Sequence, residues 1–206
     1  IGGNDLYQGY QKWTVANTGT YKIVVGGAIA DNDLNGEASP VPGKGIVIYG
    51  EYDLEKDDII IILVGQNGGN YAMNESTQAA GGGTFVVKYN GTGDLNNANS
   101  WVPILIAGGG GARTSTYSTS NRINGFNGVI QTQGTSAIGG IPGTQSSVVG
   151  IGGFSGSGGG IGTLSTDAKN YGASSGAGFL GNGIAYTSTT DRIPKSFING
   201  GLGGQN

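Results

Sequence analysis

The sequence contains no cysteine and no histidine. Without cysteine the chain has no disulfide and no thiol nucleophile, and without histidine it lacks the most common general base and zinc ligand. No other catalytic constellation stands out, so we do not expect an enzyme. Charged residues make up only 11% of the chain and form no basic cluster. Nucleic-acid binding needs such a cluster to contact phosphates, so it is not expected either.

Long apolar runs are also lacking. The longest covers residues 59–64, far short of the roughly 20 residues that a membrane-spanning helix needs, so no membrane span is expected in this chain. The sequence begins at Ile1 and not at methionine, which is typical of a processed or trimmed chain.

Glycine is abundant, with 45 positions in 206 residues, whereas proline occurs only 5 times. Glycine is thus at about three times its usual share, and proline is too rare for collagen. Glycine is sparse before Gly65 and dense after it. We interpret residues 1–206 as a single glycine-rich module, with strands mainly from residues 1–107 and a glycine-rich region over about residues 108–206.

The first half predicts short antiparallel strands, because β-branched and aromatic runs alternate with turn-forming stretches. In residues 21–25 and again in residues 84–89, the odd-numbered positions form the apolar face. These patterns favour an all-β sandwich. The expected strands are residues 13–16, 21–25, 45–49, 58–64, 84–89 and 102–107.

The second half has a three-residue glycine period, unbroken from Gly150 to Gly162. A helix with three residues per turn places these glycines on one edge, where another backbone can approach closely. Such helices have no internal hydrogen bonds, so they need lateral partners. The period predicts a bundle of left-handed polyglycine II helices, and a flexible linker is the alternative. Interspersed apolar residues favour the bundle: Ile151, Phe154, Ile161, Phe179, Ile184 and Phe197.

A series of segments then carries a family resemblance: "KWTVANTGTYKIVVGGA", "DLEKDDIIIILVGQNGG", "GGGTFVV", "LIAGGGG", "GGFSGSGGG", "GAGFLGNG" and "SFINGGLGG". In this order, over nearly the whole chain, they resemble the glycine-rich domain of anaplastic lymphoma kinase-type receptors, which also occurs in secreted proteins. The resemblance implies a tumour-necrosis-factor-like (TNF-like) antiparallel β-sandwich with an inserted bundle of polyglycine II helices.

Two departures from that family bear on function. The receptor domains carry cysteines, and this chain has none. In the family, closing strands usually follow the "NGGLGG" segment, which lies close to Asn206 here. A sandwich without its closing strand exposes an unpaired edge, which a second copy could fill by strand addition. Residues 1–10 are the candidate donor for head-to-tail assembly, and a trimmed chain is the alternative explanation.

Two N-glycosylation sequons occur, at Asn74 and Asn90. Both lie in polar stretches beside expected strands, where a glycan would reach solvent. In a secreted eukaryotic protein both are candidate glycan sites, and elsewhere such short motifs arise by chance.

Residues 31–36 match the first half of a calcium loop, with Asp31, Asp33 and Asn35 as oxygen ligands before Gly36. Pro42 stands where an EF-hand needs its bidentate acid, so the loop is not an EF-hand. A solvated turn is the favoured interpretation, and a Ca²⁺ site with these three ligands is the alternative.

Two further motifs have simpler explanations. The acids between Glu51 and Asp58 suggest a solvated loop before a strand and not a catalytic pair. The sequence "GAGFLG" matches a dinucleotide-binding fingerprint, but no strand precedes it and no helix is expected after it.

The composition and what the family resemblance implies together leave three classes of function, all extracellular or at the cell surface. The first is a structural protein that self-associates into a fibre or matrix. The second is a receptor-type module that binds a protein or glycan ligand. The third is a glycine-rich viral adhesin or an ice-binding protein, although the regular threonine ladder expected of an ice binder is absent from the sequence.

Overall fold

The computed structural model describes residues 9–30, 41–68, 80–91, 100–112, 125–131, 133–134, 137–139, 148–150, 152–159, 175–184 and 193–201. Within these residues almost every regular element is a strand. The elements are β1 (Tyr10–Thr14), β2 (Gly19–Gly26), β3 (Val47–Leu54), β4 (Ile59–Leu63), β5 (Thr84–Tyr89), β6 (Trp101–Ala107), β7 (Ala137–Gly139), β8 (Val148–Gly150) and the 3₁₀ turn η5 (Phe197–Asn199).

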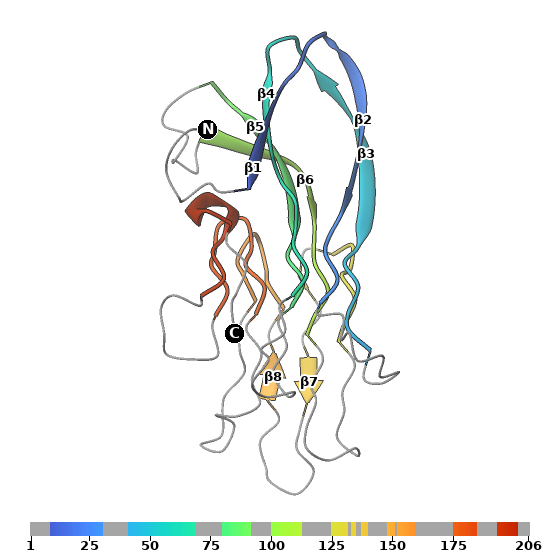
Figure 1. Cartoon of the computed structure of the whole chain (residues 1–206), viewed down its shortest axis with the longest axis vertical. Coiled ribbons are helices and arrows are strands. Elements are labelled where there is room, and N and C mark those ends of the chain that lie inside the picture. The colour runs from blue at the N-terminus through green and yellow to red at the C-terminus, as the bar shows by residue number, and fades with distance from the viewer. Residues whose placement is uncertain are drawn as a thin grey trace, which may run out of the picture.

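The strands form a four-stranded sheet in the order β1-β4-β5-β6, a two-stranded sheet of β2 and β3, and a small pair of β7 and β8. Each of these pairings is antiparallel. The first two sheets face each other at one end of the molecule, and their strands run on into glycine segments that lie side by side (Figure 1). The expected all-β architecture is confirmed.

The two facing sheets enclose one hydrophobic core. Its buried members are Val15, Val25, Leu54, Ile60, Val86 and Ala107. Tyr21 and Ile23 of β2 also pack against this core, whereas Val24, the residue after Ile23, is exposed. The alternation predicted for residues 21–25 is therefore confirmed, since successive side chains of a strand point to opposite faces.

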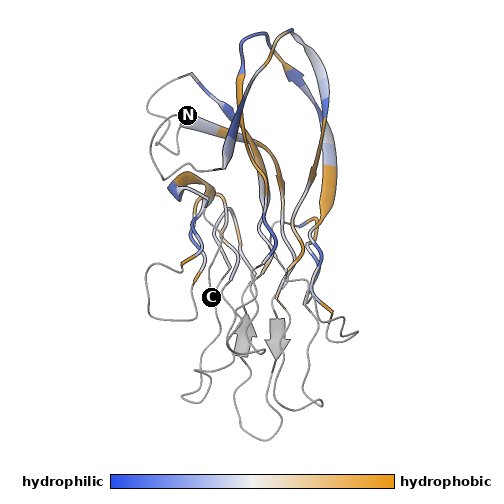
Figure 2. Cartoon of the chain, viewed as in Figure 1, coloured by the Kyte–Doolittle hydropathy of each residue, from blue (hydrophilic) through white to orange (hydrophobic). Residues whose placement is uncertain are grey.

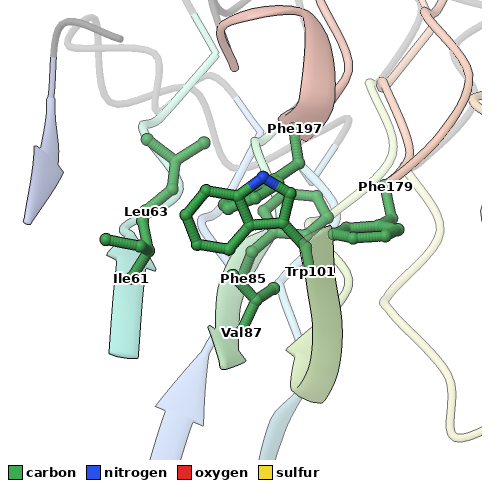
Figure 3. Packing of buried hydrophobic residues seen from close by; sticks show 7 residues of the cluster. All are labelled: Ile61, Leu63, Phe85, Val87, Trp101, Phe179 and Phe197. Atoms are coloured by element: carbon green, nitrogen blue, oxygen red, sulfur yellow. The ribbon is translucent and has the colours of Figure 1, made fainter. Parts of the chain in front are cut away.

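A second core covers the opposite face of the four-stranded sheet. The odd-numbered positions of β5 pack there, as the alternation predicted. This core also includes Phe179 and Phe197 from the last third of the chain (Figure 3). The four-stranded sheet is therefore buried on both faces, which explains why β4 has an uninterrupted apolar sequence, IIIIL.

Phe197 in η5 is the centre of an aromatic cluster. Its ring stacks on Phe179 with centroids 5.3 Å apart, and it meets Tyr10 edge-on at 5.0 Å and Trp101 at 6.1 Å. The Tyr10 hydroxyl also donates a hydrogen bond to the carbonyl oxygen of Phe197. These contacts attach η5 to strands β1 and β6, which lie at the two edges of the sheet.

Beyond the sheets, glycine-containing segments hydrogen-bond to one another in several directions. Residues 27–30 donate or accept backbone hydrogen bonds with residues 43–46, with Gly68, with Gly82 and with Gly110. A strand within a sheet has at most two such neighbours, so these segments pack as a bundle and not as a further sheet. A bond of the same kind joins the Gly111 N–H to the carbonyl oxygen of Phe126.

Close packing in this bundle depends on glycine. A Cβ atom placed on Gly110 would lie 1.9 Å from the carbonyl oxygen of Gly43, and one on Gly45 would lie 2.0 Å from that of Gly27. No side chain fits at such distances. Many of the bundle glycines are therefore required by the approach of a neighbouring backbone and not by an unusual φ angle.

Several details differ from the sequence-based expectations. The bundle takes segments from the first half of the chain as well as the second. The glycine run from Gly150 is not one continuous extended segment, because β8 ends at Gly150 and a turn follows, with positive φ at Ser155 and Gly156. Local turn geometry thus overrides the three-residue period.

Two glycines in the same segment, Gly108 and Gly110, test the role of backbone approach. We expect Gly110→Ala to destabilise the fold by about 1–3 kcal/mol or more, because the new Cβ meets backbone that cannot rotate away. Gly108→Ala is the matched control, since no atom lies within 4 Å of its Cβ position, and it should be neutral or stabilising by less than about 1 kcal/mol. Urea unfolding measures the free energy of unfolding of both variants. Equal decreases in the two variants would show that close backbone approach at Gly110 is not the cause of the destabilisation.

The aromatic cluster gives a second stability prediction. Phe197 is 2% exposed, so Phe197→Ala should cost about 3–5 kcal/mol through the cavity that it leaves. Phe154 is 56% exposed, and Phe154→Ala should change stability by no more than about 0.5 kcal/mol. Thermal unfolding followed by near-ultraviolet circular dichroism compares the two. A small effect at Phe197 would show that η5 is not needed to cover the sheet.

Candidate functional site

The residues predicted as metal ligands, Asp31, Asp33 and Asn35, lie outside the described residues, as does the sequon residue Asn74. In the part of the chain that the structure describes, no cluster of three or more carboxylate, histidine or cysteine side chains is placed to hold a metal ion. The Ca²⁺ interpretation of residues 31–36 therefore stays a prediction.

Asn90 is the sequon residue that the structure describes. It is exposed and follows β5 directly. Its N–H donates to the carbonyl oxygen of Ser100 at 2.9 Å, one step beyond the last pair of β5 and β6. Gly91 then turns the chain away with a φ of 80°. An attached glycan would therefore project from the end of the four-stranded sheet into solvent.

The acidic run does not form a single loop. Glu51 and Asp53 belong to strand β3, where Glu51 is opposite Lys22 and Asp53 accepts a 2.6 Å hydrogen bond from the hydroxyl of Thr20. Loop prediction failed here because alternation along β3 places these acids on its solvent face. The remaining acids form the tight turn from β3 to β4, in which Asp57 has a positive φ of 70°.

Asp58 is the acid of this turn with a structural partner. Its carboxylate lies 2.6 Å from the Lys88 ammonium and accepts a hydrogen bond from the Glu55 N–H at 2.8 Å. Partial burial alone would raise the pKa of Asp58, but the Lys88 hydrogen bond, the Glu55 N–H and the Lys88 charge together hold that pKa below its ordinary value. The ion pair joins the turn before β4 to strand β5, and no catalytic partner lies beside it among the described residues.

The solvent face of the two-stranded sheet carries an apolar patch that the sequence did not reveal. We call Val24, Val47 and Tyr49 the outer β2–β3 patch; their exposed fractions are 59%, 68% and 70%. Val24 and Tyr49 are cross-strand partners, and the Lys22 ammonium lies 4.8 Å from the centre of the Tyr49 ring. Figure 2 shows apolar residues at the bundle end of β3 and hydrophilic ones toward its other end.

The edges of the two main sheets differ in how they are protected. β6 carries Pro103 and a register shift opposite Val86 and Val87, two devices that block further strand pairing. β1 is only 5 residues long. In contrast, β2 and β3 are each 8 residues long and contain no proline. The two-stranded sheet therefore has the less protected edges.

Within the described residues, the two-stranded sheet is narrower than the four-stranded sheet that it faces. β2 contacts β5 and β6, whereas β3 contacts β6. The edge of β2 away from β3 thus faces toward β4 and β1, the two strands that complete the four-stranded sheet. A difference of two strands corresponds to about 10 Å of sheet width.

The dinucleotide-type motif has a structural role in the glycine segments. The Gly178 N–H bonds to the carbonyl oxygen of Gly181, and the Leu180 N–H bonds to that of Gly156. No helix follows through Ile184, so a phosphate has no helix N-terminus to bind in this described stretch.

No protein-family model matches this chain. In the described residues no helix is long and apolar enough to cross a membrane. The residues that could act in recognition are therefore identified from the structure itself, as the outer β2–β3 patch and the edges of the same sheet.

The Asp58–Lys88 pair predicts an acid-dependent stability difference. The pKa of Asp58 is lower in the folded chain than its ordinary value of 3.8, so its contribution is complete above that value and is lost as the pH falls through the folded pKa. At pH 7 we expect Asp58→Asn to be less stable than the unaltered chain by up to about 1 kcal/mol. Below about pH 3 the difference should shrink.

Urea unfolding at both pH values measures this difference, with Lys88→Met as the partner variant. A difference of the same size at pH 7 and at low pH would show that the charge of Asp58 does not contribute.

Proposed function

We propose that this chain is an extracellular structural protein that self-associates into a fibre or matrix by strand addition between copies. The observation that carries the proposal is the unequal pair of sheets, in which two 8-residue strands without proline face a sheet of four strands. A strand from a second copy, added at the outer edge of β2, would lie over β4 and extend the narrower sheet without projecting beyond the wider one.

The fold that we propose with this function is a TNF-like β-sandwich with an inserted bundle of polyglycine II helices. Two facing antiparallel sheets with a shared core support the sandwich. Hydrogen bonds from residues 27–30 to neighbours in several directions support the helices, since polyglycine II chains bond laterally on all sides. The resemblance to the glycine-rich domain of anaplastic lymphoma kinase-type receptors leads to the same assignment.

Such an assembly needs rigid subunits. The glycine bundle provides stiffness because its backbone groups are bonded to other segments, and an extended chain so tied has little freedom to bend. The donor in this proposal lies within residues 1–10. Tyr10 is already part of β1 and bonds to the carbonyl oxygen of Phe197, so the donating residues are those that precede β1.

Truncation tests this proposal. In negative-stain electron microscopy the full chain should form regular filaments, and a variant lacking residues 1–8 should remain monomeric because it has no donor. This deletion keeps β1 intact, and removal of residues 202–206 serves as the matched control that should still assemble. A synthetic peptide of residues 1–10 in excess should shorten the filaments by occupying the acceptor edge.

Discrete monomers of the full chain at all concentrations would contradict the fibre. Filaments of equal length from the chain lacking residues 1–8 would contradict this donor. Intact-mass analysis of native material tests the glycan prediction for Asn74 and Asn90. A mass above that of the 20.6 kDa polypeptide would indicate attached glycans.

A receptor-type binding module is the second candidate, and the outer β2–β3 patch favours it. Exposed apolar residues around a tyrosine are typical of surfaces that meet a protein or glycan partner. On this hypothesis the chain is a monomer, and when it is immobilised it binds a partner from the secretions of its source organism in a pull-down experiment. Tyr49→Ala should weaken that retention, whereas Val102→Ala, which removes an exposed side chain from β6, should not.

A further inference from the structure

Asparagine followed by glycine recurs along this chain, at Asn35, Asn67, Asn90, Asn124, Asn127, Asn182 and Asn199. Asparagine is among the thermally labile residues of proteins. It is most labile before glycine, because glycine has no side chain to hinder approach of its nitrogen to the asparagine amide. The repeated dipeptide raises the question of which of these bonds the fold leaves open to reaction.

The reaction needs no enzyme. A solvent base removes the N–H proton of the glycine, and the nitrogen attacks Cγ of the asparagine. The N–Cγ bond forms, the Cγ–Nδ2 bond breaks, and ammonia leaves with a proton from water. Water then opens the resulting succinimide ring at either carbonyl, which gives aspartate or isoaspartate. A glycine N–H that is held by a hydrogen bond to a carbonyl cannot begin this sequence until that bond breaks.

Most of the glycine N–H groups in these dipeptides are held in this way. Their acceptors are the carbonyl oxygens of Ile29 for Gly68 at 3.3 Å, Val41 for Gly125 at 2.9 Å, Lys44 for Gly128 at 2.8 Å, Pro194 for Gly183 at 2.9 Å and Phe197 for Gly200 at 3.2 Å. Gly183 and Gly200 are also buried.

Several asparagine side chains of these dipeptides are held as well. The Oδ1 atom of Asn127 accepts a hydrogen bond from the Lys44 N–H at 2.8 Å. The Oδ1 atom of Asn182 accepts from the Ser196 N–H at 2.8 Å and from the Nδ2 group of Asn199 at 3.0 Å. In these pairs both reacting groups are fixed, so the nitrogen and Cγ are not free to meet.

Gly91 differs from all of these glycines. It is exposed, and its N–H makes no hydrogen bond to any group in the described part of the chain. No atom lies within 4 Å of its Cβ position, and its φ of 80° leaves it outside the ladder of β5 and β6. Asn90 is exposed too, so solvent base and water reach both residues.

We propose that Asn90–Gly91 is a site of spontaneous deamidation, and that the fold protects the other described Asn-Gly bonds. Both products carry a new negative charge directly after β5, and isoaspartate also adds one carbon to the backbone. Asn90 is also a glycosylation candidate, and a glycan is attached to the same Nδ2 atom that leaves as ammonia. Deamidation therefore abolishes the sequon, and only asparagine that has not yet reacted can receive the glycan.

Hydroxylamine tests the proposal, because it opens the succinimide and releases a new amino terminus at the glycine. The full chain, produced without glycosylation, is incubated with hydroxylamine under native conditions and its fragments are weighed by mass spectrometry. Cleavage after Asn90 should be at least about tenfold faster than cleavage after Asn67, Asn127, Asn182 or Asn199, since each of the latter must first lose a hydrogen bond.

Two controls define the origin of the difference. In denaturant the rates at all these bonds should converge, because the protecting hydrogen bonds are gone. Asn90→Gln should remove the fast cleavage, and Asn127→Gln should leave it unchanged. The proposal is overturned if native cleavage after Asn127, which is also exposed, is as fast as after Asn90, or if the bond after Asn90 resists cleavage in the folded chain.

Discussion

The close approach of one backbone to another is the constraint on which this structure depends. Along the glycine segments, carbonyl oxygens lie where a Cβ would have to be, as at Gly45 and Gly110. That approach lets N–H and C=O groups of separate segments satisfy one another without a sheet or an α-helix. The bundle therefore needs very little apolar surface, which explains how a chain with 36% hydrophobic residues can fold.

Apolar side chains are concentrated where the chain does form sheets. The four-stranded sheet has a core on each face, one shared with β2 and β3 and one covered by Phe179 and Phe197. Polar side chains take structural positions at the margins, as in the Asp58–Lys88 pair between the turn before β4 and strand β5. The residues of the outer β2–β3 patch belong to neither core, so recognition at that patch need not disturb the fold.

Local patterns predicted the strands better than the contacts between them. Residues 84–89 were predicted with the bounds that β5 has, because apolar alternation is a property of adjacent residues. Glu51 and Asp53 were expected in a loop because they are charged. They belong to β3 because residues of β2 pair with them across the sheet, and the sequence around the two acids does not reveal these partners. The first-half glycines of the bundle, such as Gly27 and Gly45, also went unrecognised, because their partners are distant in sequence. The outer β2–β3 patch could not be predicted, because its residues come together only through the pairing register of β2 with β3.

The contact between Tyr10 and Phe197 joins residues 187 positions apart in the chain. Contacts between residues so far apart in the chain raise the contact order, and high contact order slows folding. On the ribosome, the first strands would be synthesised long before η5 emerges to cover them. The nascent chain would therefore expose the apolar face of β4 and β5 for much of its synthesis, and a chaperone or a rapid passage to the site of folding would be needed to prevent premature association.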